Sequence, residues 1–384
     1  MLTKYELKMP RAVYSGEGAL GKIPEIFAAN GVKRLVVFTD KGIKGAGLLE
    51  FPMAEVKKTG VEAAVLDDLP AEPSYLEAQK LVDQCKECGA DFIMAVGGGS
   101  VMDTAKLASI LMTGEYGVKE LLDEPGRARK CMKTLMIPTT AGTGSEATPN
   151  AIVAVPEKQL KVGIVNTEMI ADYVILDAVM IKKLPRKIAA ATGVDALAHA
   201  IECFTSNKAN PFSDLFALQA LDMILNNIEQ ACDDPEAMDA KNTMLLASFY
   251  AGVAITASGT TAVHALSYPL GGKYHIAHGV SNAILLAPVM RFNEPVCRPL
   301  LAKAYDRCLK GDAKTEEEKS AAVIRRLEGI VKHLDIPTSL TEFGVPKEDL
   351  EALVASGMEV TRLLVNNMRQ VTPGDARKIY QEVL

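Results

Sequence analysis

The feature that most constrains the fold is an alternation of short apolar runs with amphipathic stretches between Arg34 and about Asp177. The apolar runs read RLVVF, VEAAVL, DFIMAV, TLMIP and YVILD. Continuous apolar runs separated by helical patterns are typical of a mostly parallel sheet that helices cover on both faces. Such sheets bind ligands outside the carboxyl ends of their strands, so we expect a site there.

The character of the sequence changes after Leu184-Pro185. Long segments rich in Ala and Leu, at 187–204, 214–231 and 240–258, have helical periodicity, and strand-like runs disappear. A chain of 384 residues also exceeds what one hydrophobic core usually supports. We therefore predict an α/β domain over residues 1–183 and an all-helical domain over 184–384. The charged stretch 312–319 is predicted to be a solvated helix start.

Charge and composition exclude several classes of protein. The chain has 42 basic and 48 acidic side chains, a net charge of −6, so no global positive field attracts nucleic acid. It contains neither a run of roughly 18 apolar residues nor an apolar leader segment, which predicts a cytoplasmic protein with no membrane partner. The seven cysteines are scattered and odd in number, as expected of reduced thiols. The pair Cys85 and Cys88 falls late in a helical pattern, which favours a structural role.

A glycine loop follows the third apolar run, in DFIMAVGGGSVMDTAK. Gly97, Gly98 and Gly99 stand between a predicted strand and a predicted helix, with Ser100 as the expected N-cap. Glycine lets the backbone approach a phosphate, and the helix start presents unpaired N–H groups to the anion. Taken alone, the loop is as well explained by a tight strand-to-helix turn.

A second polar loop, TLMIPTTAGTGSEATPN, follows the next run and supplies Thr139, Thr140 and Thr143. In a parallel sheet both loops lie at one edge, where they offer hydroxyls and amides to a dinucleotide. Asp40 ends RLVVFTD, where a carboxylate would accept hydrogen bonds from a ribose and repel a 2′-phosphate. We therefore predict NAD rather than NADP. The alternative for Asp40 is an N-cap or turn carboxylate.

A carboxylate and three histidines form a candidate metal site. Asp195 and His199 are four residues apart on a helical pattern, so they share one face, and His264 and His278 follow. Four of the five histidines fall between residues 199 and 278. Such a set suits Fe²⁺ or Zn²⁺ and leaves a charge of about +1 to polarise a substrate oxygen. The alternative is that these histidines are core residues whose ring nitrogens are hydrogen-bonded within the protein. Cys203 is assigned no ligand role, because a small buried apolar role is commoner for cysteine.

Four motifs together carry a family resemblance: GGGSVMDTAK, PTTAGTGSE, TGVDALAHAIE and AVHALSYPLGGKYHIAHGVSNAILL. In this order and spacing the chain resembles the iron-containing, group III metal-dependent alcohol dehydrogenases, over nearly its whole length. The resemblance implies an α/β dinucleotide-binding domain followed by an α-helical metal domain, with the active site in the cleft. This architecture is shared with dehydroquinate synthase.

The resemblance also implies roles for individual residues. The metal would be held by Asp195, His199, His264 and His278, and the pyrophosphate by Gly97, Gly98, Gly99 and Ser100. The cofactor pocket would be lined or supported by Asp103, Thr139, Thr140, Thr143 and Lys161. Lys158 lies close to Lys161, and either is alternatively a surface charge.

One position departs from the family pattern. The family usually has a second histidine one turn after the third metal ligand, and here that position is Tyr268. With an ordinary pKa of ~10, a tyrosine does not match histidine as a proton carrier near neutral pH. His275 is the nearest alternative. Our hypothesis is that His275 or Tyr268 relays the proton to solvent.

The expected function is an NAD-dependent, divalent-metal-dependent alcohol dehydrogenase or aldehyde reductase acting on a small aliphatic alcohol, diol or hydroxyaldehyde. The metal would polarise the substrate oxygen, and hydride would pass to or from nicotinamide C4. The alternatives are polyol oxidation of the glycerol dehydrogenase type, a dehydroquinate-synthase-like lyase, and a non-enzymatic sensor of NAD or metal. Because Arg291 and Lys273 are positively charged, an anionic substrate is a further alternative.

The expected partners are a small-molecule substrate and further copies of the chain. The resemblance implies a homodimer or a higher homo-oligomer, for which the segment YELKMPRAVYSG would supply a pairing strand.

Overall fold

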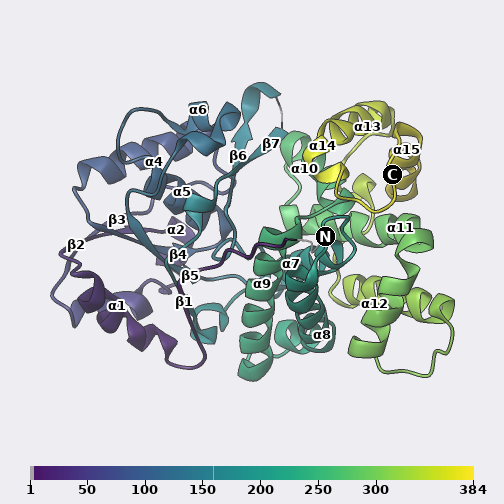
Figure 1. Cartoon of the computed structure of the whole chain (residues 1–384), viewed down its shortest axis with the longest axis horizontal. Helices are drawn as coiled ribbons and strands as arrows, with labels where there is room; N and C mark the ends of the chain where they lie inside the picture. The colour runs from purple at the N-terminus through teal and green to yellow at the C-terminus, as the bar shows by residue number, and fades with distance from the viewer. Residues whose placement is uncertain (1–3, 159) are drawn as a thin grey trace. The chain divides into compact units, whose positions relative to one another are not determined.

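The computed structural model describes residues 4–158 and 160–384, which form two compact units (Figure 1). One unit is Lys8–Leu184, and the other is Pro185–Leu384 together with the described residues before Lys8. The division falls at the Leu184-Pro185 step where the sequence changes character.

The first unit is built on a six-stranded parallel sheet. The five apolar runs form five of its strands, so the predicted α/β class is confirmed. In spatial order the strands are β1 (Ala12–Ser15), β8 (Tyr173–Leu176), β5 (Lys133–Pro138), β4 (Phe92–Gly97), β2 (Arg34–Phe38) and β3 (Glu62–Leu66).

Helices cover both faces of this sheet, as Figure 1 shows. On one face α1 (Ile23–Asn30) and α3 (Glu50–Lys57) pack their apolar side chains against alternate strand residues such as Leu35 and Val37. On the other face lie α4 (Tyr75–Glu87) and α5 (Gly99–Ile110). The shorter helices α2 (Lys41–Gly45) and α6 (Val118–Asp123) complete the unit. Burial on both faces explains why the central strands read as continuous apolar runs.

Two features of this unit were not predicted from the sequence. One is an antiparallel hairpin of β6 (Asn150–Val155) and β7 (Leu160–Val165). Along β6, buried residues alternate with half-buried ones, a period-2 signal that was present in NAIVAV. The other is β1, which comes from the segment considered for pairing between subunits. Residues 12–15 pair in parallel with β8 of the same chain, at the edge of the sheet.

The strand order places the candidate loops together. From β2 the chain moves outward to β3 and then returns to β4 on the opposite side of β2. The carboxyl ends of β2 and β4 therefore flank the point where the strand order reverses, which is where open α/β sheets bind ligands. Asp40 follows β2, Gly97–Gly99 end β4 and begin α5, and Thr139 follows β5.

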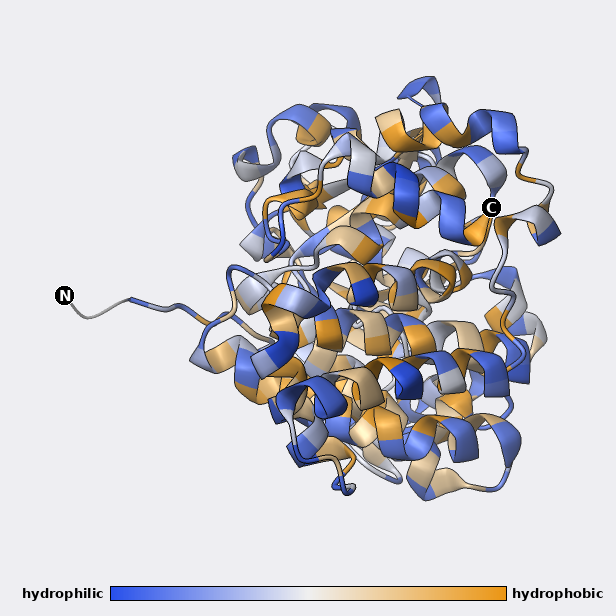
Figure 2. Cartoon of the chain, turned by 90° about the vertical axis from the view of Figure 1, so that its right-hand side faces the viewer, coloured by the Kyte–Doolittle hydropathy of each residue, from blue (hydrophilic) through white to orange (hydrophobic). Residues whose placement is uncertain are grey.

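The second unit is helical, as predicted; among its described residues, strand-like backbone pairing is limited to an isolated bridge between Ser206 and Asn367. Its helices are α7 (Arg186–Phe204), α8 (Pro211–Asp233), α9 (Met238–Ser258), α10 (Ala262–Tyr274), α11 (His278–Cys308), α12 (Glu316–His333), α13 (Leu350–Glu359), α14 (Thr361–Leu364) and α15 (Pro373–Val383). In Figure 2, helices at the surface carry both blue and orange bands, as expected of helices that face solvent on one side and the core on the other.

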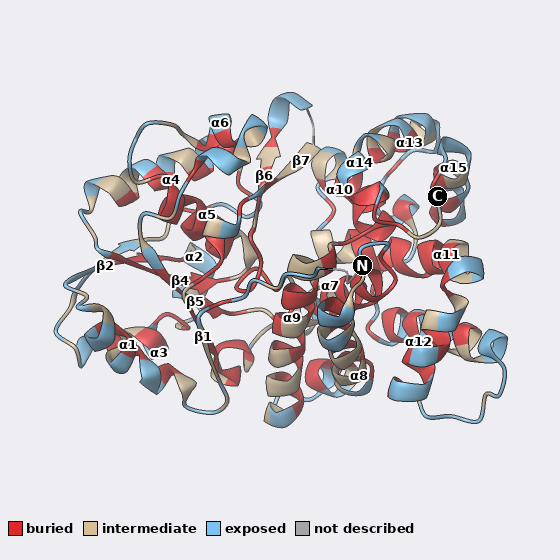
Figure 3. Cartoon of the chain, viewed as in Figure 1, coloured by how far each residue is buried: buried red, intermediate tan, exposed pale blue. Residues whose placement is uncertain are grey.

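The core of this unit lies around α7, which packs against α8, α9 and α11, while α10 packs against α11 and α13. Figure 3 shows α7 and α10 mostly in the colour of buried residues, and Ala262–Gly271 of α10 are all buried. Some helices outside this core, such as α12 and α15, begin with a side-chain cap. Thr315 and Glu318 form a capping box at the start of α12, so the charged stretch 312–319 does contain a helix start.

No single helix among the described residues is long and apolar enough to cross a membrane. One pair, α9 with α10, meets the length and composition test only jointly, and the chain bends by 107° between these two helices.

All seven cysteines are free thiols. Cys85 is buried in α4, and Cys88 is the C-cap of that helix. Burial raises the pKa of the Cys85 thiol to about 12 and also raises the pKa of Cys88. A reactive thiol needs a lowered pKa, so this pair lacks the character of a redox motif.

Candidate metal and nucleotide sites

The structure brings Asp195, His199, His264 and His278 together. One donor atom from each lies within 4.8 Å of the others. The Oδ1 atom of Asp195 is 3.8, 3.6 and 3.5 Å from the Nε2 atoms of His199, His264 and His278, respectively. Four donors that bind one tetrahedral cation at ~2.1 Å stand roughly 3.4 Å apart. The donor set therefore fits a single divalent cation in both chemistry and spacing.

Three helices supply these four side chains. Asp195 and His199 stand one turn apart on α7, His264 lies in the first turn of α10, and His278 is the first residue of α11. Gly279 allows α11 to approach α7, because a Cβ at this position would lie 2.1 Å from the carbonyl oxygen of Ala191. This close approach of two backbones brings His278 to the residues of α7.

The group is largely shielded from solvent. The side chains of Asp195, His199 and His264 are 3 to 7% exposed, whereas that of His278 is 29% exposed. Burial alone would raise the pKa of Asp195, but the three histidines outweigh it and hold that pKa well below its usual range. The Asp195 carboxylate is thus an anionic donor, and the site is open on the side of His278.

Asn282, one turn after His278 on α11, was not predicted as a site residue. It is fully buried, and its Nδ2 donates to Asp195 Oδ1 at 2.7 Å. The same nitrogen lies 3.1 Å from Nε2 of His264 and 3.2 Å from Nε2 of His278. Its spacing of four from His278 on a helix was the available signal.

Glu202 is a second buried residue that the sequence patterns did not reveal. It is fully buried on α7, and its Oε2 atom makes a short contact with His264 Nδ1. Burial opposes its charge, yet His264 and nearby donors lower the pKa of this carboxyl below its usual value. Glu202 follows Asp195 by seven residues, a spacing that places both on the same helix face. This spacing was the sequence signal that could have identified Glu202 as a site residue.

Tyr268 lies beside the four donors. Its ring centroid is 6.2 Å from that of His278, and the residue is 8% exposed. Burial raises the pKa of the Tyr268 hydroxyl, while a hydrogen bond to Arg362 acts in the opposite direction. The phenol therefore stays protonated at neutral pH. His275 is outside the four-donor group, exposed at the C-cap of α10 in a left-handed conformation with φ 54°.

The two polar loops of the first unit also meet. The amide of Thr139 donates to Gly97 O at 3.0 Å. A Cβ on Gly99 would lie 2.8 Å from the Thr143 side chain, and one on Gly97 would lie 2.6 Å from Val101. Glycine is thus required at both positions for close packing of loop, strand and helix.

The start of α5 is suited to an anion. Its N-cap is Gly98, and no side chain caps its first amides. The prediction of Ser100 as the N-cap was wrong, because the helix already begins at Gly99 and Ser100 lies in its first turn. The buried hydroxyls of Thr39 and Thr139, at the ends of β2 and β5, have no hydrogen-bond partner among the described residues. This edge therefore fits a polar ligand such as a dinucleotide.

Lys161 is connected to the glycine loop through Glu72. Lys161 Nζ lies 2.6 Å from Glu72 Oε1, and the amide of Glu72 donates to Ser100 Oγ at 3.3 Å. The side chain of Lys161 is 9% exposed, whereas Lys158 is exposed. Of the two lysines, only Lys161 is held at the edge that carries the loops.

Asp103 supports the second loop rather than lining an open surface. Its carboxylate accepts hydrogen bonds from Ser145 Oγ and from the amide of Ile152. Lys106, which the sequence patterns did not single out, is fully buried; its Nζ lies 2.9 Å from Asp103 Oδ1 and donates to Ser145 O at 3.0 Å. A lysine three residues after Asp103 on one helix was the available signal.

Asp40 caps α2. Its Oδ1 accepts from the amide of Ile43 at 2.8 Å, which is the alternative role considered for it. The cap employs one carboxylate oxygen at the carboxyl end of β2, next to the point where the strand order reverses. A role toward a ribose therefore remains a prediction.

The two cations considered for an anionic substrate are already paired. Arg291 contacts Glu328 and Glu382, and Lys273 Nζ lies 2.7 Å from Asp349. Arg362, beside Tyr268, has no carboxylate within ion-pair distance among the described residues. Of these three cations, Arg362 is the one that the structure places beside Tyr268 without a paired carboxylate.

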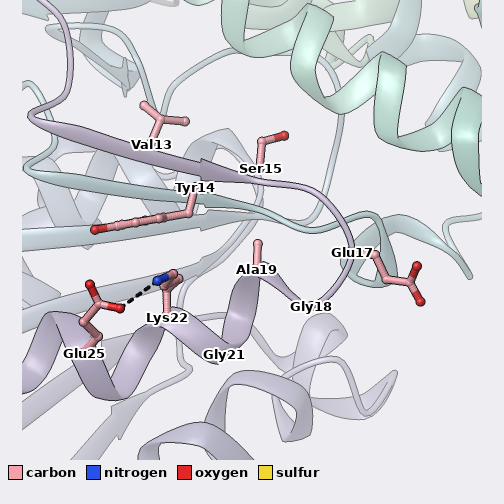
Figure 4. Close-up of a pocket in the computed structure, with 9 residues that line it drawn as sticks. All are labelled: Val13, Tyr14, Ser15, Glu17, Gly18, Ala19, Gly21, Lys22 and Glu25. Atoms are coloured by element: carbon pink, nitrogen blue, oxygen red, sulfur yellow. Dashed lines mark hydrogen bonds and ion pairs between the residues drawn. The ribbon is translucent and has the colours of Figure 1, made fainter.

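A hollow of about 620 Å³ lies elsewhere, beside β1 and the turn that follows it (Figure 4). Its polar residues include Lys22 and Glu25, which pair with each other at 2.7 Å. It contains none of the predicted site residues, so it adds nothing to either site.

Comparison with known families follows the two units. Residues 10–178 match the family described as iron-containing alcohol dehydrogenase, and residues 189–384 match the C-terminal part of the same family. The chain belongs to the iron-containing alcohol dehydrogenase family. Members of this family are oxidoreductases that act on alcohols and use NAD and a divalent metal.

Individual members of the iron-containing alcohol dehydrogenase family match along almost the whole chain. The long-chain-alcohol dehydrogenase 1 of Geobacillus thermodenitrificans is 33% identical, over 97% of this chain and 95% of that protein. The sulfoacetaldehyde reductase of Bilophila wadsworthia is 34% identical, over 91% and 92%. The structure of an alcohol dehydrogenase from Oenococcus oeni superposes with a TM-score of 0.93 at 28% identity, over 99% and 100%.

Proposed function

We propose that this family member is an NAD-dependent, divalent-metal-dependent alcohol dehydrogenase or aldehyde reductase acting on a small aliphatic alcohol, diol or hydroxyaldehyde. The observation that carries the proposal is the group of four donor atoms within 4.8 Å of one another in the helical unit. Three imidazoles and one carboxylate suit Fe²⁺ or Zn²⁺, and membership of the iron-containing family makes Fe²⁺ the first choice.

In this proposal Asp195, His199, His264 and His278 hold the cation. A divalent cation supplies a Lewis acid for the substrate oxygen, and NAD supplies the hydride acceptor. The residues themselves fix the donors in place and exclude water. Three of the four side chains are at least 93% shielded, and access is left on the side of the half-buried His278. An ionic interaction is stronger in such a water-poor setting.

The nucleotide is proposed to bind at the carboxyl edge of the parallel sheet. The uncapped start of α5, at Gly98, Gly99 and Ser100, would accept the pyrophosphate. Thr139, Thr140 and Thr143 would supply hydroxyls from the adjoining loop, while Gly97, Asp103 and Lys161 hold the loops in position. Asp40, at the end of β2, would favour NAD over NADP by repelling a 2′-phosphate.

Two residues are proposed for the movement of the proton. Tyr268 is protonated at neutral pH and so serves as a hydrogen-bond donor near the substrate oxygen rather than as a base. His275 is exposed to solvent at the C-cap of α10, and its imidazole ring has one nitrogen that can accept a proton and one that can donate a proton. We therefore assign the exchange of the proton with solvent to His275.

A second substrate class is a short aldehyde that carries an anionic group. Arg362 forms a hydrogen bond with Tyr268, and no carboxylate among the described residues lies within ion-pair distance of it. A guanidinium binds sulfonates and carboxylates through paired N–H donors. The relative from Bilophila wadsworthia, named as a sulfoacetaldehyde reductase, supports including this class.

A panel of substrates tests the proposal. NADH consumption would be followed with short neutral aldehydes and with sulfoacetaldehyde, after loading the enzyme anaerobically with Fe²⁺, Zn²⁺ or no metal. We expect metal-dependent reduction, and Arg362→Ala should raise KM about tenfold for an anionic aldehyde only, if that class is used. Binding of NAD and metal without reduction of any aldehyde would favour a sensor. Catalysis without net change in NADH would favour a lyase.

We also propose that the enzyme is a homodimer or a higher homo-oligomer. β1 lies at the edge of its sheet, and on its outer side no further strand of the described residues pairs with it. Sedimentation equilibrium tests the proposal, and a monomer across micromolar concentrations would contradict it.

A further inference from the structure

Glu202 connects two of the helices that carry the donor group. It stands on α7, three residues after His199, and its side chain reaches the beginning of α10. One carboxylate oxygen, Oε1, accepts from Thr261 N at 3.0 Å, Thr261 Oγ1 at 2.7 Å and Val263 N at 2.8 Å. The other oxygen, Oε2, contacts His264 Nδ1.

These donors explain how a fully buried carboxylate is tolerated. An isolated charge in the interior costs several kcal/mol, unless hydrogen bonds and an opposite charge compensate for it. Thr261 is the N-cap of α10 but makes no side-chain cap of its own, so Glu202 takes that place from another helix. The positive end of the α10 dipole adds to the compensation. Glu202 is therefore held as an anion in one orientation.

That orientation constrains the ring of His264. An ionised carboxylate can only accept hydrogen bonds, so the imidazole nitrogen that faces Oε2, which is Nδ1, must carry a proton. In the neutral ring that can bind a cation, the proton-free nitrogen is then Nε2, the atom 3.6 Å from Asp195 Oδ1. A ring nitrogen binds a cation only through its lone pair, so the partner of the other nitrogen decides which one is the donor.

We infer that Glu202 is a positioning residue of the metal site: it fixes His264 with Nε2 as the donor and supplies the second negative charge of the buried cluster. The inference rests on the proposed function, because it presumes that the four donors hold a cation. With Asp195, Glu202 gives the site two negative charges, which balance one divalent ion. The net charge of about +1 expected from four ligands alone is thereby cancelled.

The alternative is that Glu202 serves only as the cap of α10. A cap without a role at the metal site would affect the stability of the fold but not the choice of donor atom on His264. The two roles are separable, because one carboxylate oxygen serves the cap and the other serves His264.

Glu202→Gln separates them. The side chain keeps its shape, and its carbonyl oxygen still accepts from Thr261 and Val263. Its NH₂ group, however, faces His264 Nδ1, which must then accept, so the proton moves to Nε2 and blocks the donor position. We expect the dissociation constant for Co²⁺ or Zn²⁺ to rise roughly 10- to 100-fold, with an altered visible spectrum of the Co²⁺ protein. NAD affinity should change less than about twofold, since the glycine loop belongs to the other unit.

Two matched variants serve as controls. Thr261→Val removes a donor to the cap oxygen and leaves the contact with His264, so metal affinity should stay within about threefold of the wild type. Glu146→Gln changes another buried glutamate, in the first unit, and should leave metal affinity unchanged. If Thr261→Val weakens metal binding as much as Glu202→Gln does, capping alone explains the effect and the inference is overturned.

A measurement on the wild-type chain covers the case in which Glu202→Gln does not fold. Nitrogen-15 NMR of the Zn²⁺-loaded protein, with five histidines to assign, should show His264 protonated at Nδ1 and bound through Nε2. Coordination of the metal through Nδ1 of His264 would overturn the inference about Glu202 but not the proposed function. Wild-type protein that retains no divalent cation would overturn the proposed function as well, so the two failures are distinguishable.

Discussion

The ring of Tyr268 lies 6.2 Å from the ring of His278, centroid to centroid, at the one donor whose side chain is appreciably exposed. A phenol thus occupies the place beside the metal donors where the family pattern has an imidazole. Burial raises the pKa of this phenol, so its charge does not change across the neutral range. The pH dependence of the reaction should therefore originate elsewhere.

Replacement of Tyr268 tests this point. Tyr268→Phe should lower kcat/KM roughly 3- to 10-fold through loss of one hydrogen bond, without altering the shape of the pH profile. Tyr268→His should add a limb near pH ~6.5 to alcohol oxidation, because it introduces an imidazole. Steady-state rates across the acid, neutral and alkaline ranges provide the measurement. A limb that is present in the wild type and lost in Tyr268→Phe would show that the phenol itself titrates.

His275→Ala tests the proposed route of the proton. We expect kcat for alcohol oxidation to fall about 10²-fold, the size of a general acid–base contribution, and added imidazole to restore part of it. Metal content and NAD affinity should be retained, since His275 is outside the donor group. Unchanged turnover together with an unchanged pH profile would remove His275 from this role.

His278→Ala separates the two sites. Loss of one of four donors should abolish turnover and reduce the metal content measured by elemental analysis after dialysis. NAD binding, followed by fluorescence titration, should stay within about twofold of the wild type, because the proposed nucleotide residues lie in the other unit. Full activity in a metal-free preparation of His278→Ala would contradict the proposed mechanism.

Asp40 has two proposed roles that one pair of variants can distinguish. Asp40→Asn keeps an N-cap of α2 but removes the charge, so the ratio of kcat/KM for NADP to that for NAD should rise about tenfold. Asp40→Ala should change the ratio similarly and in addition lower stability by roughly 1 kcal/mol. Comparable wild-type efficiency with both nucleotides would argue against Asp40 as the selective residue.

The buried carboxyl of Glu146 should make the free energy of unfolding depend on pH. Burial raises the pKa of this carboxyl from 4.5 to about 7 in the folded protein. The folded state therefore binds more protons than the unfolded state between these values, and stability is lost as the pH rises through them. Glu146→Gln should be more stable than the wild type at about pH 8, by roughly 3 kcal/mol, and nearly equal to it at about pH 4.5. Urea unfolding of the wild type and Glu146→Gln at both pH values measures this difference in stability. A difference of the same size at both pH values would contradict the prediction.

Much of the fold followed from the sequence because its signals are local. The five apolar runs predicted five strands, and helical periodicity predicted the second unit, since burial on both faces of a sheet or on one face of a helix sets the residue pattern directly. The hairpin of β6 and β7 was missed although its alternation was present. The N-cap of α5 was wrongly assigned to Ser100 because a glycine N-cap leaves no side-chain signal.

The sequence by itself indicated the four metal donors, because histidine is scarce in this chain and the donors include a pair at helical spacing. It also indicated the glycine loop, because glycines between a predicted strand and a predicted helix can be recognised from residue order alone. Only the tertiary structure decided which atoms face one another. Gly279 brings α11 against α7, Glu202 reaches from α7 to His264, and Arg362 comes to Tyr268 from a distant helix. Such contacts join residues that are 62 to 94 positions apart in the chain, or they bring the backbones of two helices into contact. They depend on how the helices pack, which local periodicity does not specify.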